Sequence, residues 1–393
     1  MKDRNVKIEC LRSASSYQIS IGKEGIGNCG QWARKCLGRD AAKISIVSNT
    51  TVYKLYGATV TASLADAGFS VSHWLMKDGE VHKNLGNVER ALEFFSQSGL
   101  MRTDAVVALG GGVVGDLAGF AASIYIRGVR FLQIPTTLLA MIDSSVGGKT
   151  GVNAAFGKNS IGAFHQPSGV LIDTAVLATL PERELAAGFC EVIKHGALSG
   201  QKLLDQTAKF LTRYPLGQFA GIKEDGKFKS EISNLRYEIA DLISKNVEFK
   251  AKIVARDELE SSKRTDSRSR KILNFGHTFA HALEKVTDYK YFKHGEAVGY
   301  GILYAAELSK TLALCDIKDV KLLYDVVHSV GPLPSLVNID SQEVFEAFRF
   351  DKKHVAGSLQ LILLKAIGKP VIVNNCDIPS SAHTKALKQL LKF

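Results

Sequence analysis

The stretch ALGGGVVGDLAGFAASIYIRG (Ala108–Gly128) decides the fold class. An apolar run ends in glycines, and a second apolar run follows them and ends at an arginine. Gly110, Gly112 and Gly115 fit the G-x-G-x-x-G spacing between an expected strand and an expected helix. Such glycines let a backbone approach a pyrophosphate, and a helix N-terminus offers free N–H groups and positive potential. The same glycines also permit a tight strand-to-helix turn that holds no ligand.

A dinucleotide fingerprint also needs an acidic residue about 20 positions further on, where it contacts a ribose. The sequence there, YIRGVRFLQ (Tyr125–Gln133), is basic and apolar. We therefore expect a nucleotide-binding turn of another α/β type. Asp116 directly follows the last glycine, where a carboxylate is unusual beside a pyrophosphate. We expect Asp116 to contact a ribose, a nicotinamide amide or neighbouring backbone.

The segments around this stretch alternate between strand and helix patterns. Apolar or β-branched runs predict strands at Lys43–Ser48, Asp104–Gly112, Val129–Thr137 and Gly169–Pro181. The residues after the first of these runs have helical spacing, which ends at Gly68. This alternation predicts a parallel sheet covered by helices.

Helical periodicity dominates after Pro181, as in Glu182–Leu198 and Glu231–Ala255. The sequence therefore predicts an α/β nucleotide-binding domain over residues 1–180 and a mainly α-helical domain over residues 181–393. The polar, glycine-punctuated segment Gly217–Ser230 is expected to be a loop.

Length and composition narrow the class of protein. A chain of 393 residues is long enough for two domains, and its 46% hydrophobic and 23% charged residues are typical of soluble globular proteins. The six cysteines form no C-x-x-C pair, which argues against a disulfide framework and indicates a reducing, cytoplasmic compartment. The N-terminus lacks the apolar core of a signal peptide, and no apolar run approaches the length of about 20 residues that a spanning helix needs. We expect no membrane partner.

The net charge of +11 raises nucleic-acid binding as an alternative. A nucleic-acid surface would need a basic stripe interleaved with aromatic residues. The densest basic stretch, SSKRTDSRSRK (Ser261–Lys271), contains no aromatic residue. We therefore expect no nucleic-acid partner, and instead a phosphorylated or carboxylated small molecule.

Two further blocks carry groups that suit catalysis. The segment Ile134–Pro167 places several polar side chains among glycines: Asp143, Lys149, Asn153, Lys158 and Asn159. Lysines beside turn glycines bind anions, although a solvated loop can also carry them.

Histidines form the second block. His277 and His281 lie one helical turn apart, as in histidine pairs that ligate zinc. His294 in HGE and Glu191 in CEVIKHG extend this set to a catalytic metal site with one open position. The alternative for such a histidine pair is core packing with satisfied hydrogen bonds.

These blocks together resemble the 3-dehydroquinate synthase family. The motifs GGGVVGDLAGFAASIYIRG, IPTTLLAMIDSSVGGKTGVN, LPERELAAGFCEVIKHG and LNFGHTFAHALE carry the resemblance in this order, and it extends from about Lys43 to Gly368. It implies an N-terminal nucleotide-binding α/β domain, a helical C-terminal domain and a site in the cleft between them.

The resemblance also implies site residues. A zinc or cobalt ion would be held by Glu191, His277 and His294, and His281 would contact the substrate instead of the metal. The other substrate-site positions are Asp143, Lys149, Asn159, Lys194, Lys250, Arg270, Asn274 and Lys352 or Lys353. Arg127 matches an arginine that reaches the substrate phosphate across a homodimer. The NAD contacts would be Glu80, Lys83, Gly111, Gly112, Gly115, Asp116, Thr136, Thr137, Lys149, Lys158 and Thr179.

One segment departs from the family pattern. The basic, serine-rich stretch within Asp257–His277 replaces a short glycine turn, and it leaves the place of Glu260 open. We expect a surface loop here instead of a lid. We also expect Arg270 to lie one helical turn before Asn274 and two before His277, where its planar fork suits a carboxylate. The alternative is an exposed arginine that extends the basic run.

The implied reaction converts 3-deoxy-D-arabino-heptulosonate 7-phosphate to 3-dehydroquinate and phosphate in the shikimate pathway. It proceeds by transient oxidation with NAD, β-elimination of phosphate, reduction, ring opening and an intramolecular aldol step. A sister sugar-phosphate cyclase that makes valiolone- or inosose-type rings is the first alternative, and a dehydrogenase of the glycerol dehydrogenase type is a more distant one. The intact RKILNFGHTFAH favours the synthase.

Overall fold

The computed structural model describes residues 4–9, 16–22, 25–219, 229–337, 339–340, 342–347 and 359–391. The chain folds into two compact units. The first unit is Met1–Thr179 with Glu224–Ala251, and the second is Leu180–Lys223 with Lys252–Phe393. Most of the long helix α8 (Lys229–Arg256) therefore belongs to the first unit. The domain limits at residues 180 and 181 stay a prediction.

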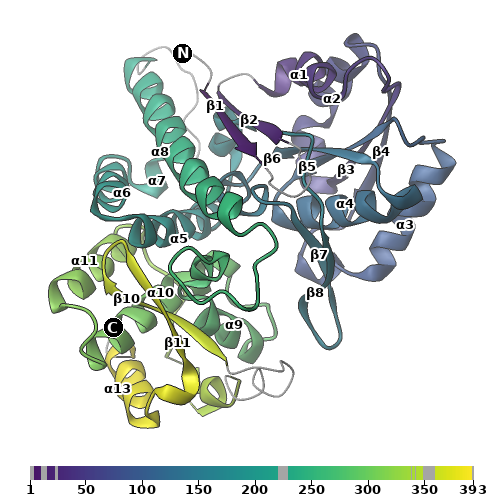
Figure 1. Ribbon diagram of the computed structural model, residues 1–393. Coiled ribbons are helices and arrows are strands. Elements are labelled where there is room, and N and C mark those ends of the chain that lie inside the picture. The colour runs from purple at the N-terminus through teal and green to yellow at the C-terminus, as the bar shows by residue number, and fades with distance from the viewer. Residues whose placement is uncertain are drawn as a thin grey trace. The chain divides into compact units, whose positions relative to one another are not determined.

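A seven-stranded sheet forms the centre of the first unit, in the order β1-β2-β9-β6-β5-β3-β4 (Figure 1). The strands are β1 (Arg4–Glu9), β2 (Ser16–Gly22), β3 (Lys43–Asn49), β4 (Ser70–Met76), β5 (Ala105–Gly110), β6 (Arg130–Pro135) and β9 (Gly169–Asp173). All neighbours are parallel except β1 and β2, which are antiparallel. The predicted parallel sheet is confirmed, and the antiparallel edge made by β1 was not predicted.

Helices cover this sheet, and most residues of its central strands β3, β5, β6 and β9 are buried. The helices include α1 (Cys29–Leu37), α2 (Thr50–Asp66), α3 (Leu85–Gln97) and α4 (Gly112–Ile124). Every residue of β5 is buried, as parallel sheets with two covered faces require. Helix α2 begins where the Asn49 side chain accepts a hydrogen bond from the Val52 N–H at 2.8 Å. It ends before Gly68, whose φ of +82° stops the helix.

A separate antiparallel hairpin packs on α4. It consists of β7 (Lys149–Ala154) and β8 (Gly157–Phe164). A Cβ atom on Gly119 of α4 would lie 2.5 Å from the Thr150 methyl group, so only glycine permits this close approach. The second half of the block Ile134–Pro167, whose lysines were expected beside turn glycines or in a solvated loop, is thus a hairpin.

The second unit is mainly helical, as predicted. Its helices include α5 (Glu182–Ser199), α6 (Gln201–Arg213), α7 (Leu216–Phe219), α9 (His277–Val286), α10 (His294–Thr311), α11 (Ile317–His328) and α13 (Ser380–Leu390). A Cβ atom on Gly295 would clash with the Ala187 carbonyl oxygen, so α10 approaches α5 closely at this glycine. The hairpin of β10 (Gln360–Ala366) and β11 (Lys369–Asn374) was not predicted.

The loop expected over Gly217–Ser230 is corrected at both ends. Gly217 lies in α7, which continues to Phe219, and α8 already begins at Lys229. The middle of that segment, residues 220–228, lies outside the described residues.

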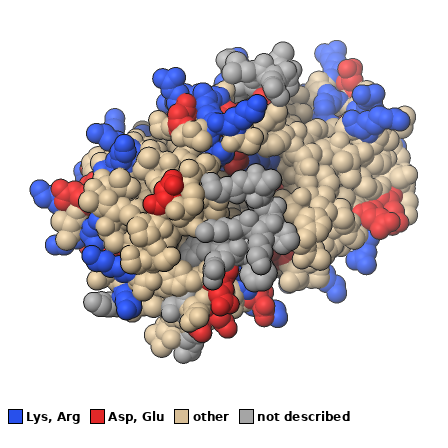
Figure 2. Space-filling model, turned by 60° about the horizontal axis from the view of Figure 1, so that its bottom comes forward, with Lys and Arg blue, Asp and Glu red and all other residues tan. Residues whose placement is uncertain are grey.

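Two surface properties bear on possible partners. No helix in the described part of the chain is both long and apolar enough to span a lipid bilayer. On the face shown in Figure 2, Lys and Arg side chains lie in separate groups, with Asp and Glu side chains beside several of them.

Candidate active site

The glycine turn expected to hold a nucleotide joins β5 to α4. Gly111 is the N-cap residue of α4 and provides no side-chain cap to the first N–H groups of the helix. A Cβ atom on Gly111 would lie 3.0 Å from the Thr137 methyl group, and one on Gly112 would lie 3.0 Å from Ser144 Oγ. The turn is thus a backbone cradle that any larger residue would narrow, which fits a pyrophosphate group.

Gly110, Gly115 and Thr136 hold the backbone around this turn in place. A Cβ atom on Gly115 would lie 2.9 Å from Gln133 Oε1, so Gly115 allows α4 to pack against β6. Thr136 is buried, and its N–H donates to the Gly110 carbonyl oxygen at 3.0 Å. None of the four glycines from 110 to 115 has a positive φ, so close approach explains them better than turn geometry.

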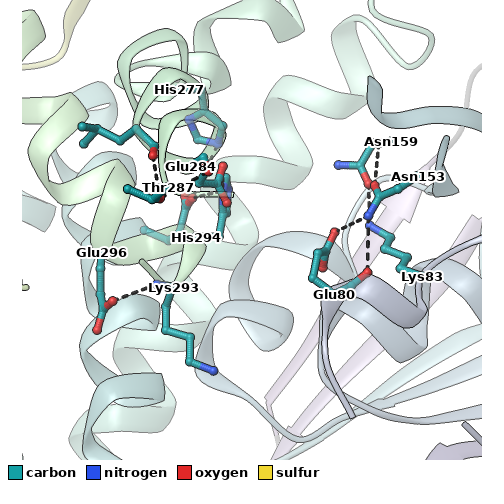
Figure 3. A network of polar contacts seen from close by, with 12 residues as sticks. Glu80, Lys83, Asn153, Asn159, His277, Glu284, Thr287, Lys293, His294 and Glu296 are labelled. Carbon is teal, nitrogen blue, oxygen red and sulfur yellow. Dashed lines mark hydrogen bonds and ion pairs between the residues drawn. The ribbon is translucent and has the colours of Figure 1, made fainter. Parts of the chain in front are cut away.

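Lys83 lies at the centre of a polar network in the first unit (Figure 3). Its Nζ donates to Asp116 Oδ2 at 2.6 Å and to Asn159 Oδ1 at 2.5 Å. Burial raises the pKa of Asp116, and the neighbouring Lys83 ammonium opposes that shift. Asn159 has a φ of +51°, the left-handed region that a non-glycine residue adopts at some cost. Asp116, expected beside a ribose, an amide or backbone, faces a lysine that its own motif did not indicate.

Asn153 extends the network from Lys83 to Glu80 (Figure 3). Its Nδ2 donates to Glu80 Oε1 at 2.9 Å, and its Oδ1 accepts from the Asn159 N–H at 2.8 Å. The structure therefore brings four predicted residues together: Glu80, Lys83, Asp116 and Asn159. Lys149 begins β7 and is exposed, and Lys158 is half-buried in β8.

Asp143 and Lys250 form a second pair in the first unit. Asp143 lies in a short π-helical turn, Ala140–Ser144, and Lys250 lies on α8. The buried Lys250 Nζ donates to the Asp143 carbonyl oxygen at 2.6 Å and also pairs with its carboxylate. The fold thus joins two residues that are more than a hundred positions apart in the sequence.

Arg127 is presented by a strained turn. Ile126 and Arg127 have φ values of +41° and +69°, and Gly128 follows with +110°. Arg127 is exposed and lines a hollow of about 460 Å³ together with Arg102 and Arg130. Consecutive non-glycine residues in the left-handed region are rare, and such strain is common at functional sites.

Thr179, also expected at the nucleotide, ends the 3₁₀ segment Thr174–Thr179 that follows β9. It is exposed, and its hydroxyl hydrogen-bonds with the Tyr56 hydroxyl.

The three predicted metal ligands meet in the second unit. Glu191 lies on α5, and His277 and His294 are the first residues of α9 and α10. One ligand atom from each residue lies within 4.8 Å of the others. Gly276 has a φ of +79°, and a Cβ atom there would lie 2.8 Å from the Ile302 nitrogen. Gly276 and Gly295 therefore let the helices that carry the two histidines approach their neighbours.

The distances within this cluster suit one metal ion. Glu191 Oε1 lies 3.6 Å from His277 Nε2 and 3.7 Å from His294 Nε2, too far for hydrogen bonds. Two ligand atoms of one tetrahedral zinc ion lie roughly 3.3–3.4 Å apart. Glu191 is fully buried, and Oε1 has no hydrogen-bond partner among the described residues. A buried carboxylate oxygen that faces two imidazole nitrogens fits a divalent metal site.

His281 lies on the edge of this cluster. It is exposed on α9, and its ring centroid lies 5.7 Å from that of His277 and 6.0 Å from that of His294. The sequence spacing paired His277 with His281. In the structure, His277 instead shares the Glu191 oxygen with His294.

The expected helical relation between Arg270 and His277 is wrong. Arg270–Asn274 form a 3₁₀ turn, Phe275 leaves the helical region with a ψ of 125°, and Gly276 is left-handed with a φ of +79° before α9 begins. Arg270 is only 2% exposed, so it is not the exposed arginine of the alternative explanation.

The inserted segment is a loop fastened at its base by Asp257. The Asp257 carboxylate accepts hydrogen bonds from the Ser261 N–H at 2.8 Å, the Arg270 N–H at 2.9 Å and the Ser269 hydroxyl at 3.2 Å. Glu260, whose place was open, lies beside Asn274, whose Nδ2 donates to Glu260 Oε1 at 3.3 Å. Lys352 and Lys353 lie outside the described residues.

Two neighbours of the site were not predicted. Asp257 holds the Arg270 backbone, and Glu284 contacts His294 (Figure 3). A signal existed for Glu284, because it follows His277 by seven residues and thus shares its helix face. Nothing in the sequence indicated that the Asp257 carboxylate would accept hydrogen bonds from residues at both ends of the inserted loop.

Comparison with known proteins places these features in a family. The family model described as 3-dehydroquinate synthase N-terminal matches residues 73–187, and the one described as 3-dehydroquinate synthase C-terminal matches residues 188–354. A 3-dehydroquinate synthase of Nostoc sp. is 38% identical over 377 residues, which are 95% of this chain and 96% of the relative.

Solved structures of cyclases are also similar. A 2-epi-5-epi-valiolone synthase from Streptomyces hygroscopicus subsp. jinggangensis, with NAD+ and Zn2+ bound, is 26% identical with a TM-score of 0.80 over 96% of this chain and 97% of that one. A 2-deoxy-scyllo-inosose synthase complexed with carbaglucose-6-phosphate, NAD+ and Co2+ is 24% identical with a TM-score of 0.80 over 99% of both chains. The predicted fold class is confirmed. From the two family models and the near full-length identity to the Nostoc synthase, the chain belongs to the 3-dehydroquinate synthase family.

Proposed function

We propose that this chain is an enzyme that converts 3-deoxy-D-arabino-heptulosonate 7-phosphate to 3-dehydroquinate and phosphate. It would thus be a carbon–oxygen lyase acting on a phosphate. The observation that carries the proposal is the Glu191 oxygen that faces two histidine nitrogens, in a chain of this family. The reaction is redox-neutral overall but passes through a transient oxidation of a hydroxyl group, so it needs a hydride acceptor and a site that binds this hydroxyl.

We assign the metal site to Glu191, His277 and His294. A zinc or cobalt ion bound there would polarise the hydroxyl that is oxidised and stabilise negative charge on its oxygen. Lys194 Nζ lies 2.5 Å from Glu191 Oε2, and the two side chains are almost completely buried. Lys194 therefore offsets the charge on one carboxylate oxygen and leaves the other directed at the histidines.

We assign the nucleotide site to the turn between β5 and α4. Gly111 and Gly112 leave room for a pyrophosphate at the first N–H groups of α4. NAD would take up one hydride and return it, so the protein must retain the cofactor through the cycle. Lys83 orders Asp116 and Asn159, and Glu80 is held by Asn153. The other residues proposed to contact NAD are Gly115, Thr136, Thr137, Lys149, Lys158 and Thr179.

The remaining residues are proposed to bind the substrate. Arg270 would hold the carboxylate, because a planar guanidinium grips a carboxylate with two hydrogen bonds. Arg127, from the second copy in a homodimer, would bind the phosphate. The phosphate itself can take the neighbouring proton during elimination. The other proposed contacts are Asp143, Lys149, Asn159, Lys194, Lys250, Asn274, His281 and Lys352 or Lys353.

A sister cyclase that makes valiolone- or inosose-type rings is the alternative. Its sugar phosphate substrates lack the carboxylate, so they give a buried Arg270 no matching charge. The identity of 38% to a 3-dehydroquinate synthase, against 26% to a valiolone synthase, also supports the first proposal.

One assay tests the proposal and the alternative together. The protein is incubated with NAD, Zn²⁺ or Co²⁺, and either the heptulosonate phosphate or sedoheptulose 7-phosphate. Phosphate, dehydroquinate and NADH absorbance are measured. We expect equal amounts of phosphate and dehydroquinate from the first substrate, with no accumulation of NADH. Equal turnover of sedoheptulose 7-phosphate would indicate a sister cyclase, and stoichiometric NADH would indicate a dehydrogenase.

A further inference from the structure

Glu284 is a buried carboxylate beside a proposed metal ligand. It lies on α9 and is 3% exposed. His294 Nδ1 lies 3.2 Å from Glu284 Oε2 and 3.3 Å from Oε1 (Figure 3). When Glu284 is ionised, its carboxylate can only accept a hydrogen bond, and the shared proton is then on Nδ1.

The proton on Nδ1 leaves the other ring nitrogen free to act as a ligand. With Nδ1 protonated, a neutral imidazole carries its lone pair on Nε2. His294 Nε2 is the atom that lies 3.7 Å from Glu191 Oε1. An ionised Glu284 would therefore favour the tautomer in which His294 directs the Nε2 lone pair toward the point that Glu191 Oε1 also faces.

His277 shows the same arrangement with a weaker acceptor. Its Nδ1 lies 3.2 Å from the Phe275 carbonyl oxygen, and its Nε2 lies 3.6 Å from Glu191 Oε1. Both imidazoles thus have an acceptor at Nδ1 and direct Nε2 to one point. The acceptor is neutral for His277 and negatively charged for His294, so the second hydrogen bond is the stronger one.

The backbone around Glu284 is fixed independently of its side chain. The Glu284 carbonyl oxygen accepts from the Tyr289 N–H at 2.7 Å and from the Thr287 hydroxyl at 3.3 Å. These bonds close the C-terminal end of α9, and they remain when the carboxylate is changed. A change of the Glu284 carboxylate therefore removes its hydrogen bond to His294 and leaves these backbone bonds in place.

We propose that Glu284 is a positioning residue for the metal site. Its carboxylate fixes the tautomer and ring orientation of His294 and raises the basicity of Nε2. The inference rests on the proposed metal site and adds a residue beyond its three ligands. Partners of metal-bound histidines typically contribute 10–100-fold to metal affinity.

The test compares Glu284→Gln and Glu284→Ala with the wild-type protein. The probe is Co²⁺, titrated into the metal-free protein and followed by its visible absorption and by calorimetry. We expect one site, with a Kd raised about 10-fold in Glu284→Gln and up to about 100-fold in Glu284→Ala. The smaller effect of Gln is expected because its amide oxygen still accepts from Nδ1 but carries no charge. We also expect the absorption bands of bound Co²⁺ to change in Glu284→Ala.

Glu307→Gln is the matched control. Glu307 is a buried glutamate of α10, 5% exposed, and it pairs with Lys310 at 2.5 Å instead of with a histidine. We expect Glu307→Gln to change the melting temperature but to leave the Kd for Co²⁺ unchanged. Circular dichroism of every variant establishes that it is folded.

The tautomer is measured directly in the metal-free protein. Nitrogen-15 NMR of labelled histidines distinguishes Nδ1–H from Nε2–H, and a His294→Asn spectrum assigns the signal. We expect His294 to carry its proton on Nδ1 in the wild type and to lose that preference in Glu284→Ala.

Each failure has a separate signature. Unchanged Kd values and an unchanged His294 tautomer in folded Glu284 variants would overturn the proposal. The proposal would also be overturned if the wild type bound a second Co²⁺ that the Glu284 variants lost, because Glu284 would then be a ligand itself within the His281–Glu284–His294 group. Absence of tight Co²⁺ binding by the wild type would instead contradict the proposed function, and the NMR measurement would still decide the role of Glu284.

Discussion

Nζ of Lys194 lies 2.5 Å from Oε2 of Glu191, one turn away on α5, and both side chains are buried. An ion pair in such a place loses the hydration of both charges, and removal of one partner leaves an uncompensated buried charge. Lys194 thus makes a buried Glu191 carboxylate tolerable in the metal-free protein. A bound divalent cation would compensate the same carboxylate from its other oxygen.

Lys194→Met is therefore expected to destabilise the metal-free protein by about 3–5 kcal/mol. Co²⁺ should restore part of that loss, so it should raise the melting temperature of Lys194→Met more than that of the wild type. Denaturant and thermal unfolding, with and without Co²⁺, measure both effects.

Lys310→Met provides the control for this comparison. Lys310 and Glu307 form another i,i+3 pair at 2.5 Å, on α10, and Lys310 is 31% exposed. We expect Lys310→Met to lose less stability than Lys194→Met. Co²⁺ should raise its melting temperature by the same amount as that of the wild type. Equal Co²⁺ responses of Lys194→Met and Lys310→Met would contradict the charge compensation at Glu191.

His277→Ala should remove tight metal binding, because it leaves only two of the three proposed ligands. We expect less than one tenth of the wild-type Zn²⁺ to remain after dialysis against a mild chelator, and turnover to be lost with it. Metal analysis of the dialysed proteins is the measurement. His328→Ala, at an exposed histidine of α11, should keep full stoichiometry. Retention of metal and activity by His277→Ala would exclude His277 as a ligand.

The fold class followed from local patterns in the sequence. Apolar runs of strand length and the glycine turn predicted β3, β5, β6 and β9, because buried parallel strands are apolar on both faces. The edge strands β1 and β4, the strand β2 next to β1, and the β10–β11 hairpin were not predicted. The strand preference of a residue depends on its packing against cross-strand and same-face neighbours, so half-buried strands such as these have a weak local pattern.

The candidate site, too, was predicted from the sequence only in part. Residue types and motif context predicted Glu191, His277 and His294, which come from three different helices. Periodicity failed at Arg270, because Phe275 and Gly276 break the helix that the spacing assumed. Asp257 and Glu284 act through hydrogen bonds to other residues, and such contacts depend on tertiary packing that spacing does not describe.

Asp257 offers a prediction that depends on pH. Burial raises the pKa of Asp257, but hydrogen bonds from the Ser261 and Arg270 N–H groups and the Ser269 hydroxyl more than offset this, so the pKa is lowered. A carboxyl group whose pKa is lowered by folding stabilises the protein above its unfolded-state pKa, and this contribution disappears as the pH falls through the folded-state pKa. Asp257→Asn should therefore reduce stability at neutral pH by about 1–3 kcal/mol, with a smaller difference in acid.

Urea unfolding of Asp257→Asn across the pH range checks this sign. Asp266→Asn is the control within the same loop, because the Asp266 side chain is 57% exposed. It should change stability little at any pH. The opposite result would be a difference in stability between the wild type and Asp257→Asn that grows as the pH falls. It would show that the hydrogen bonds to the ionised Asp257 carboxylate do not stabilise the loop.

Arg270→Ala should separate the proposed function from that of a sister cyclase. Arg270 is buried, and its Nη1 donates to the Glu258 carbonyl oxygen at 2.6 Å, which fixes one end of the guanidinium group. Truncation of one partner in a desolvated charge pair costs about 2–5 kcal/mol, so kcat/KM for the heptulosonate phosphate should fall by roughly two orders of magnitude or more. Co²⁺ and NAD affinities should change little, and Arg268→Ala, at an exposed arginine two residues earlier, should behave as the wild type. Steady-state kinetics with the heptulosonate phosphate and with sedoheptulose 7-phosphate measure the effect. An Arg270→Ala enzyme of normal efficiency, or a wild type that turns over both sugars equally, would show that this arginine does not recognise the carboxylate.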